Sequence, residues 1–147
     1  MTDIAKRKQT ETAAPAQAGT GTRRLLLAED DAITRQVLGL MLKRSNYKVD
    51  FAEDGLEAVE MWEKGAYDLV LMDVQMPRSN GFEATRAIRE KERELLCHTP
   101  IVAMTAHAYK EGCLAAGMDI CISKPVDFAK ILKVIGEIFN KQYSYAP

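Results

Sequence analysis

The chain has 147 residues, of which 47% are hydrophobic and 28% are charged, a composition typical of one globular domain. Its 20 Lys and Arg residues balance 21 Asp and Glu residues, which disfavours a nucleic-acid-binding protein or one that binds anionic membranes. No stretch approaches the roughly 20 apolar residues of a membrane span, and the first residues lack the apolar core of a secretory signal. We expect a cytoplasmic protein without membrane insertion.

Residues 1–22 are mostly small, polar or charged, with Met1 and Ile4 as the larger apolar side chains. Such a segment cannot bury enough surface to offset the entropy cost of ordering, so we expect a flexible tail or linker. We expect one folded domain at residues 23–141 and a short tail at residues 142–147. The three cysteines lack C-x-x-C spacing, which predicts reduced, structural thiols.

Five apolar runs alternate with five amphipathic stretches inside the expected domain. The apolar runs predict strands at residues 24–28, 47–51, 67–72, 100–104 and 118–122. The amphipathic stretches predict helices at residues 32–45, 55–64, 82–96, 108–116 and 126–140. Runs such as Leu25-Leu26-Leu27 lack alternation, as expected for strands buried on both faces of a parallel sheet. The pattern predicts an α/β fold with a doubly wound five-stranded parallel sheet in the flavodoxin-like order 2-1-3-4-5 and helices on both faces.

Ligands of such sheets bind beyond the carboxyl ends of the strands, where the strand order reverses. Glu29 and Asp30 follow the first predicted strand, and Asp73 follows the third. If these strands are neighbours, the three carboxylates share one cleft, where a cation would relieve their repulsion. Mg²⁺ suits this cleft because it takes carboxylate ligands, keeps several waters and leaves room for a phosphate oxygen.

Two further strand ends carry polar side chains, Thr105 after the fourth strand and Lys124 after the fifth. A hydroxyl and an ammonium beside a cation-bound carboxylate suit the developing charge of a transferred phosphoryl group. Asp73 is the predicted nucleophile, because carboxylates can take phosphoryl groups covalently. The combination favours phosphoryl-transfer chemistry at this edge of the sheet.

Each of these residues also has an ordinary structural interpretation. Asp30 or Asp31 can cap the first helix, Thr105 can be a turn hydroxyl, and Lys124 can be a solvated turn residue. The charged run at residues 86–94 indicates a solvated helix face. The joint placement of the residues at four strand ends favours the site over these interpretations.

The motifs then resemble a known family, the receiver domain of two-component response regulators, of the type attached to hybrid sensor histidine kinases. The resemblance covers residues 24–140. It rests on LLLAEDD (residues 25–31), LMDVQMP (71–77), GFEAT (81–85), PIVAMTA (100–106), AGMD (116–119) and SKP (123–125).

This resemblance implies that Asp73 is the phosphoacceptor, which receives a phosphoryl group from a phosphohistidine on a histidine kinase or a histidine phosphotransfer protein. Asp30 and Asp73 would bind Mg²⁺ directly, together with the backbone carbonyl of Gln75. Glu29 would act on the ion through a bound water. The chain would thus be a signalling domain, not an enzyme, with self-catalysed phosphorylation and dephosphorylation.

The same resemblance implies roles for the remaining residues and surfaces. Thr105 would follow the phosphoryl group as the switch hydroxyl, and Lys124 would pair with the acylphosphate. Gln75 and His107 occupy the positions where the family sets its dephosphorylation rate. A downstream partner would bind the face formed by the fourth helix, the fifth strand and the fifth helix.

Two features depart from the family pattern. Cys121 stands where the family usually has an aromatic residue, three residues before Lys124. The segment between Thr105 and Lys124 is short by about one helical turn of roughly 3.6 residues, which we place in the fourth helix. These departures keep open a receiver-like docking module that works without phosphorylation.

Two enzyme or cofactor classes fit less well. A phosphatase of the haloacid dehalogenase type would need a second Asp two residues after its nucleophile, where this chain has Gln75. A flavin-binding protein would need a phosphate-binding loop where Glu29, Asp30 and Asp31 would repel the phosphate. Neither tail can form an output domain, so we expect a stand-alone receiver or the receiver segment of a longer kinase.

Overall fold

The computed structural model describes residues 22–76, 80–106 and 110–140. The tails expected at residues 1–22 and 142–147 lie outside this part of the chain, apart from Thr22, and so does His107. No helix among the described residues is long and apolar enough to cross a membrane.

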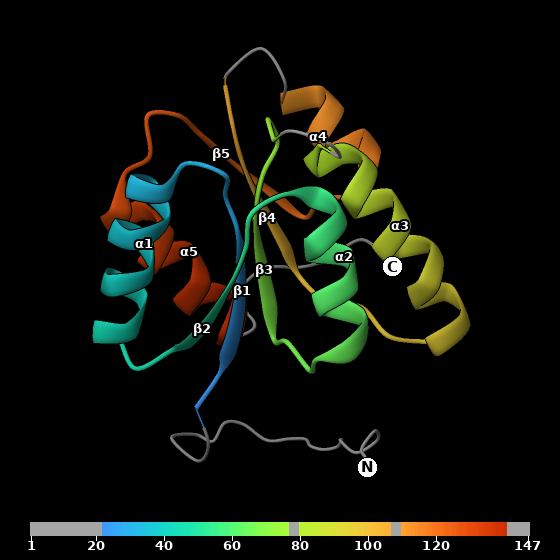
Figure 1. Cartoon of the computed structure of the whole chain (residues 1–147), viewed down its shortest axis with the longest axis horizontal. Helices are drawn as coiled ribbons and strands as arrows, with labels where there is room; N and C mark the ends of the chain where they lie inside the picture. Colours follow the sequence, from blue (N-terminus) through green and yellow to red (C-terminus); the bar gives the residue numbers. More distant parts are fainter. Residues whose placement is uncertain (1–21, 77–79, 107–109, 141–147) are drawn as a thin grey trace.

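The core of the structure is one parallel sheet of five strands in the order β2-β1-β3-β4-β5 (Figure 1). Adjacent strands pair in parallel throughout, and β1 lies between β2 and β3. The sheet confirms the predicted fold class and strand order. The strands are β1 (Arg24–Ala28), β2 (Lys48–Ala52), β3 (Leu69–Asp73), β4 (Ile101–Thr105) and β5 (Ile120–Ser123).

Helices cover both faces of the sheet (Figure 1). One face carries α1 (Ala32–Arg44) and α5 (Phe128–Phe139). The other face carries α2 (Gly55–Lys64), α3 (Gly81–Leu95) and α4 (Lys110–Ala116). With seven residues, α4 is about half as long as α3, which has 15.

Two hydrophobic cores form because successive side chains of a strand point to opposite faces of the sheet. Leu25 and Leu27 of β1 pack in the core under α1 and α5, whereas Leu26 packs in the core under α2 and α3. All three are fully buried, and burial of one such side chain contributes roughly 1.5–3 kcal/mol. The apolar run without alternation is therefore explained by burial on both faces.

Most element boundaries differ from the sequence prediction by one or two residues, and a hydrogen bond explains two of these shifts. The predicted helix start at residue 126 moves to Phe128, because the Asp127 side chain caps the helix. The predicted strand start at residue 118 moves to Ile120, because the Met118 N–H donates to the Cys113 carbonyl and so completes the end of α4.

The charged run at residues 86–94 is not a uniformly solvated face, and that interpretation is wrong for two of its members. The side chains of Arg89 and Glu92 are only 17% and 4% exposed. Their charges are compatible with burial because they pair at 2.7 Å, and Arg89 also pairs with Asp119 at 2.8 Å. The sequence pattern could not reveal Asp119 as a partner because it lies 30 residues away.

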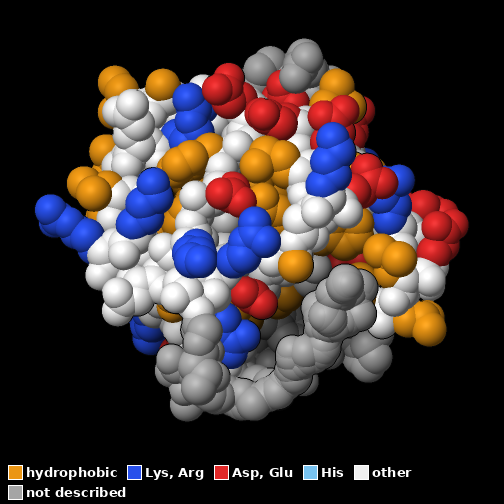
Figure 2. Space-filling view, turned by 60° about the horizontal axis from the view of Figure 1, so that its bottom comes forward, with side chains coloured by type: hydrophobic (Ala, Val, Ile, Leu, Met, Phe, Trp, Pro, Cys, Tyr) orange, Lys and Arg blue, Asp and Glu red, His pale blue; other side chains and the backbone are white. Residues whose placement is uncertain are grey.

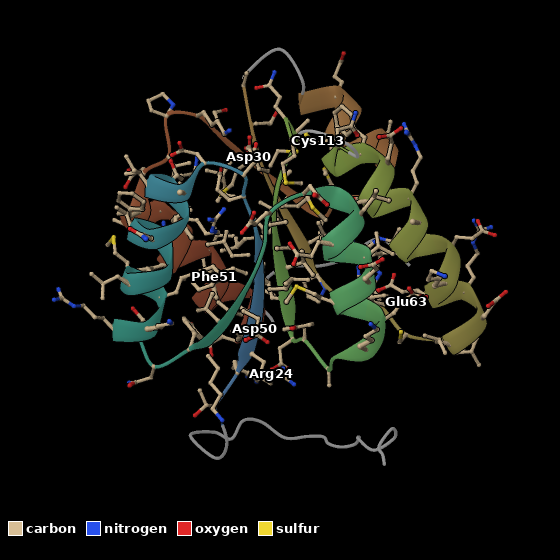
Figure 3. The ribbon with its side chains drawn as sticks, in the orientation of Figure 1. Arg24, Asp30, Asp50, Phe51, Glu63 and Cys113 are labelled. Carbon is tan, nitrogen blue, oxygen red and sulfur yellow. The ribbon has the colours of Figure 1, made fainter. Side chains whose placement is uncertain are left out.

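The amino-terminal end of the sheet carries charges of both signs (Figure 2). Arg24 and Asp50, labelled near this end in Figure 3, pair at 3.1 Å. The Tyr67 hydroxyl donates to the same carboxylate at 2.7 Å. Burial, followed by this hydrogen bond, raises the pKa of Tyr67 to about 12. The ion pair joins β1 to β2 and so explains these charges by a structural role.

Candidate functional site

The carboxyl ends of β1 and β3 bring the predicted carboxylates of the site together. Glu29 and Asp30 come directly after β1, and Asp73 is the last residue of β3. Because β1 and β3 are neighbours, the carboxylates meet, and one ligand oxygen from each lies within 4.8 Å of the others. Figure 3 labels Asp30 at these strand ends, near the start of α1. The three carboxylates predicted to share a cleft are thus close together.

Burial makes the ionised state of this acidic cluster unfavourable. Glu29 is 3% exposed and Asp73 is 1% exposed, whereas Asp30 is open to solvent. Burial, followed by the nearby charge of Asp73, raises the pKa of Glu29 to about 7. The Asp31 N–H opposes this rise by donating to Glu29 Oε2 at 3.1 Å. Near neutral pH, the cluster therefore favours uptake of a proton or a cation.

Asp73 is held by two donors from different elements. Lys124 Nζ lies 2.8 Å from Asp73 Oδ1, and the backbone N–H of Gln75 donates to the same oxygen at 3.2 Å. The Lys124 side chain is 32% exposed, so its ammonium reaches the buried carboxylate from the solvent side. This charge-assisted pair brings the end of β5 to the end of β3.

Thr105 and Lys124 occupy the ends of the adjacent strands β4 and β5. The Lys124 N–H donates to the Thr105 carbonyl at 2.8 Å, and the peptide bond between Lys124 and Pro125 is cis. The Thr105 side chain is 1% exposed, and its hydroxyl donates to the Ala106 carbonyl at 3.1 Å. The hydroxyl is therefore bonded to the residue after β4, in agreement with the interpretation of Thr105 as a turn hydroxyl.

Two hydrogen bonds and a close approach of α3 fix the backbone directly after Asp73. Val74 N–H donates to the Met104 carbonyl at 3.1 Å, and Gly81 N–H donates to the Val74 carbonyl at 2.9 Å. A Cβ atom on Gly81 would lie 2.5 Å from the Asp73 carbonyl oxygen, so only glycine fits this approach of α3 to β3. Gln75 is exposed beside Asp73. The start of α3 therefore fixes the backbone on which Asp73 sits.

Asp31 belongs to α1 and not to the acidic cluster. Its side chain accepts from the Thr34 N–H at 2.8 Å and from the Thr34 hydroxyl at 2.6 Å. The hydroxyl bond, followed by the N–H bond, lowers the pKa of Asp31. The predicted helix cap is confirmed for Asp31.

Sequence reasoning missed Arg35, which supports the cluster from α1. Its Nη1 donates to the Glu29 carbonyl at 2.9 Å, and its Nη2 lies 3.8 Å from a Glu53 carboxylate oxygen. Arg35 follows the Asp31 cap by one helical turn, a spacing that predicts at most a pair between these two side chains. The bond to the Glu29 backbone carbonyl leaves no side-chain pattern, so the sequence could not predict it.

The described geometry agrees with the result of a comparison with known protein families. Residues 25–136 match the response regulator receiver domain. This chain is a receiver domain of that family. The receiver domain is 41% identical over 139 residues to hybrid signal transduction histidine kinase B of Dictyostelium discoideum. That alignment covers 86% of this chain and 7% of the kinase.

Solved receiver structures agree with this assignment. The receiver domain of a sensor histidine kinase from Pseudomonas aeruginosa, solved with a magnesium ion in its active-site cleft, has a TM-score of 0.73 and 34% identity over 81% of this chain and 98% of that one. The receiver domain of yeast Ssk1, solved with the histidine phosphotransfer protein Ypd1 of Saccharomyces cerevisiae, gives a TM-score of 0.78 and 30% identity. The match covers 82% of this chain and 91% of the yeast chain.

The receiver domain spans only a small part of its curated relatives. It covers 5% of the length of hybrid signal transduction histidine kinase M of Dictyostelium discoideum and 18% of the length of histidine kinase 5 of Arabidopsis thaliana. The relatives are therefore far longer than the receiver, and their other activities belong to regions that this chain does not match.

Proposed function

We propose that this receiver domain accepts a phosphoryl group on Asp73 from a phosphohistidine of a histidine kinase or a histidine phosphotransfer protein. The observation that carries the proposal is the 2.8 Å pair between Lys124 and the buried Asp73 carboxylate, beside two further carboxylates. Gln75 and Lys124 both donate to Oδ1, so we assign Oδ2 as the nucleophile. As the bond from Oδ2 to phosphorus forms, the N–P bond of phosphohistidine breaks and its electron pair stays on the imidazole nitrogen.

The acidic cluster has the donor chemistry of a magnesium site. Asp30 and Asp73 would bind the ion directly with the Gln75 backbone carbonyl, and Glu29 would bind it through a water. Two nearly buried carboxylates beside an exposed one suit a hard dication that keeps several waters. When bound, Mg²⁺ neutralises charge on the phosphoryl oxygens during transfer.

Lys124 and Thr105 would respond to the added phosphoryl group. The group adds about −1.5 to −2 charges beside the Lys124 ammonium, which can pair with a phosphoryl oxygen. Thr105 would exchange its bond to the Ala106 carbonyl for a bond to the phosphoryl group. This rotation would change the loop after β4 and so the adjoining face of α4, β5 and α5, where we place the downstream partner. Leu114 of α4, 61% exposed, supplies an apolar contact on that helix.

The phosphodonor would approach along α1, which begins beside the acidic cluster. Ile33, Val37 and Leu40 lie at helical spacing along this helix and are 73%, 39% and 54% exposed. This apolar stripe, defined by the three residues, is suited to pack against a helix of the donor protein. The proposal thus separates the donor surface on α1 from the output surface on α4, β5 and α5.

Hydrolysis would reset the domain without a separate catalyst. Water attacks phosphorus, the bond to Asp73 Oδ2 breaks, and inorganic phosphate leaves. Gln75 and His107 would set the rate of this step, Gln75 from its exposed position beside Asp73. We place the working unit at residues 23–141 and in the cytoplasm, a compartment that keeps thiols such as the three free cysteines reduced.

Intact mass spectrometry after incubation with Mg²⁺ and acetyl phosphate tests the proposal. We expect a gain of one phosphoryl group that is lost with Asp73→Asn and with EDTA. A phosphorylated histidine phosphotransfer protein as donor provides the second arm. If neither donor adds a phosphoryl group to the folded wild type, phosphoacceptor function is wrong and the docking module takes its place.

A further inference from the structure

A buried charge cluster at the amino ends of β4 and β5 is not used by the proposed chemistry. It consists of Arg89 and Glu92 of α3 and Asp119, the residue before β5. Arg89 Nη1 contacts Glu92 at 2.7 Å and the Thr99 carbonyl at 2.9 Å, and Nη2 contacts Asp119 at 2.8 Å. Its Nε donates to the Gly117 carbonyl at 2.9 Å. One guanidinium thus joins α3 to the segments that lead into both strands.

Asp119 fixes β5 against β4 with both its backbone and its side chain. Its N–H donates to the Ile101 carbonyl at 2.9 Å, and its Oδ2 accepts from the Ile101 N–H at 2.8 Å. His98 Nε2 lies 2.9 Å from Oδ1 of the same carboxylate. This double contact sets which residue of β4 lies opposite the start of β5, and Arg89 in turn holds the carboxylate.

The strand that this cluster holds is short and lies at the edge of the sheet. β5 has four residues, and in the described part of the chain it pairs only with β4. Its opposite end carries Lys124, five residues after Asp119 or about 16 Å along an extended strand. A shift of the strand by one residue would move Lys124 by about 3.3 Å. A movement of that size would break its 2.8 Å contact with Asp73.

We infer that Arg89 and Asp119 are positioning residues for Lys124, acting through the register of β5. The inference rests on the proposed function, because it concerns how Lys124 meets the phosphoryl group on Asp73. The metal half of the site comes from β1 and β3, whereas the hydrogen bonds of this cluster join α3 to the segments before β4 and β5. Loss of the cluster therefore weakens phosphoryl binding, but it does not weaken magnesium binding, because it moves a competing ammonium away from Asp73.

Two calorimetric titrations on the full chain separate these effects, one with Mg²⁺ and one with beryllofluoride, a phosphoryl mimic, at saturating Mg²⁺. For Asp119→Asn, which keeps the size and one acceptor oxygen, we expect beryllofluoride affinity to fall by about fivefold or more. Mg²⁺ affinity should not fall, because the ammonium that competes with the ion for Asp73 is held less well. Arg89→Lys, which keeps the charge but loses the planar fork, should cause a smaller loss in the same direction.

The matched control is Arg93→Lys, the same substitution one turn further along α3 in an exposed pair with Glu90. It should change neither affinity. A double variant completes the test: in a Lys124→Met background, Asp119→Asn should cause no additional loss of beryllofluoride affinity. Urea unfolding defines conditions in which every variant is folded.

The outcomes are distinct. Unchanged beryllofluoride affinity in Asp119→Asn and Arg89→Lys, or an equal loss of both affinities, refutes the positioning role. An additional loss in the Lys124→Met background refutes it as well. If the wild type binds Mg²⁺ but no beryllofluoride, the proposed phosphoacceptor function itself fails, and the positioning role fails with it.

Discussion

Replacement of Glu29 by Gln should make the metal-free protein more stable at high pH. In the folded protein, the pKa of Glu29 is raised from 4.5 to about 7 by burial and by the charge of Asp73. The folded state therefore binds more protons than the unfolded state between these values, and the free energy of unfolding falls as pH rises through that window. The shift corresponds to about 3 kcal/mol lost between pH 4.5 and pH 8.

Urea unfolding in EDTA, at intervals from pH 5 to pH 8, measures this loss. The Glu29→Gln variant has no carboxyl to titrate, so its curve over this range should lack about 2 to 3 kcal/mol of the wild-type decline. Saturating Mg²⁺ should restore the wild type at pH 8 because a dication replaces the proton, and should help Glu29→Gln less. Parallel pH curves for the two proteins in EDTA would refute the electrostatic account of the cluster.

Three further changes have separate readouts. Gly81→Ala should lower the free energy of unfolding by about 2 kcal/mol or more in urea denaturation, because its Cβ would meet the Asp73 carbonyl at 2.5 Å; an unchanged midpoint would contradict this. Lys124→Met should slow phosphorylation by acetyl phosphate about a hundredfold, followed by intact mass, while Mg²⁺ still binds; a wild-type rate would remove Lys124 from the mechanism. Val37→Ser should slow transfer from a phosphorylated phosphotransfer protein but not from acetyl phosphate, and equal slowing with both donors would exclude the α1 stripe as the donor surface.

The fold could be predicted because burial of the sheet on both faces requires uninterrupted apolar runs in the sequence. Leu25, Leu26 and Leu27 must all be apolar, since they face two different cores. The candidate site could be predicted for a related reason, because Glu29 and Asp73 interrupt such runs at the carboxyl ends of strands. A charge directly after a buried strand is conspicuous even in a single sequence.

Contacts that depend on tertiary packing could not be predicted, because no sequence pattern indicates them. Arg89 and Glu92 lie in a run of charges that has the pattern of a solvated helix face, yet both are buried, and Arg89 pairs with Asp119, 30 residues away. The Thr105 hydroxyl could have been directed at Asp73 or at its own loop, and the sequence is the same in both cases. The structure has the hydroxyl on the Ala106 carbonyl.

The candidate site is divided between central and edge strands, and this division has a consequence for signalling. The carboxylates belong to β1 and β3, which have strands on both sides. Lys124 follows β5, an edge strand held by β4 and by the Arg89 and Asp119 contacts. An edge strand has fewer hydrogen bonds to lose when it moves, so a phosphoryl group that pulls on Lys124 should shift the β5 side of the site while the metal ligands stay in place. The proposed output face contains the same strand, so it would move with Lys124 if that residue binds the phosphoryl group.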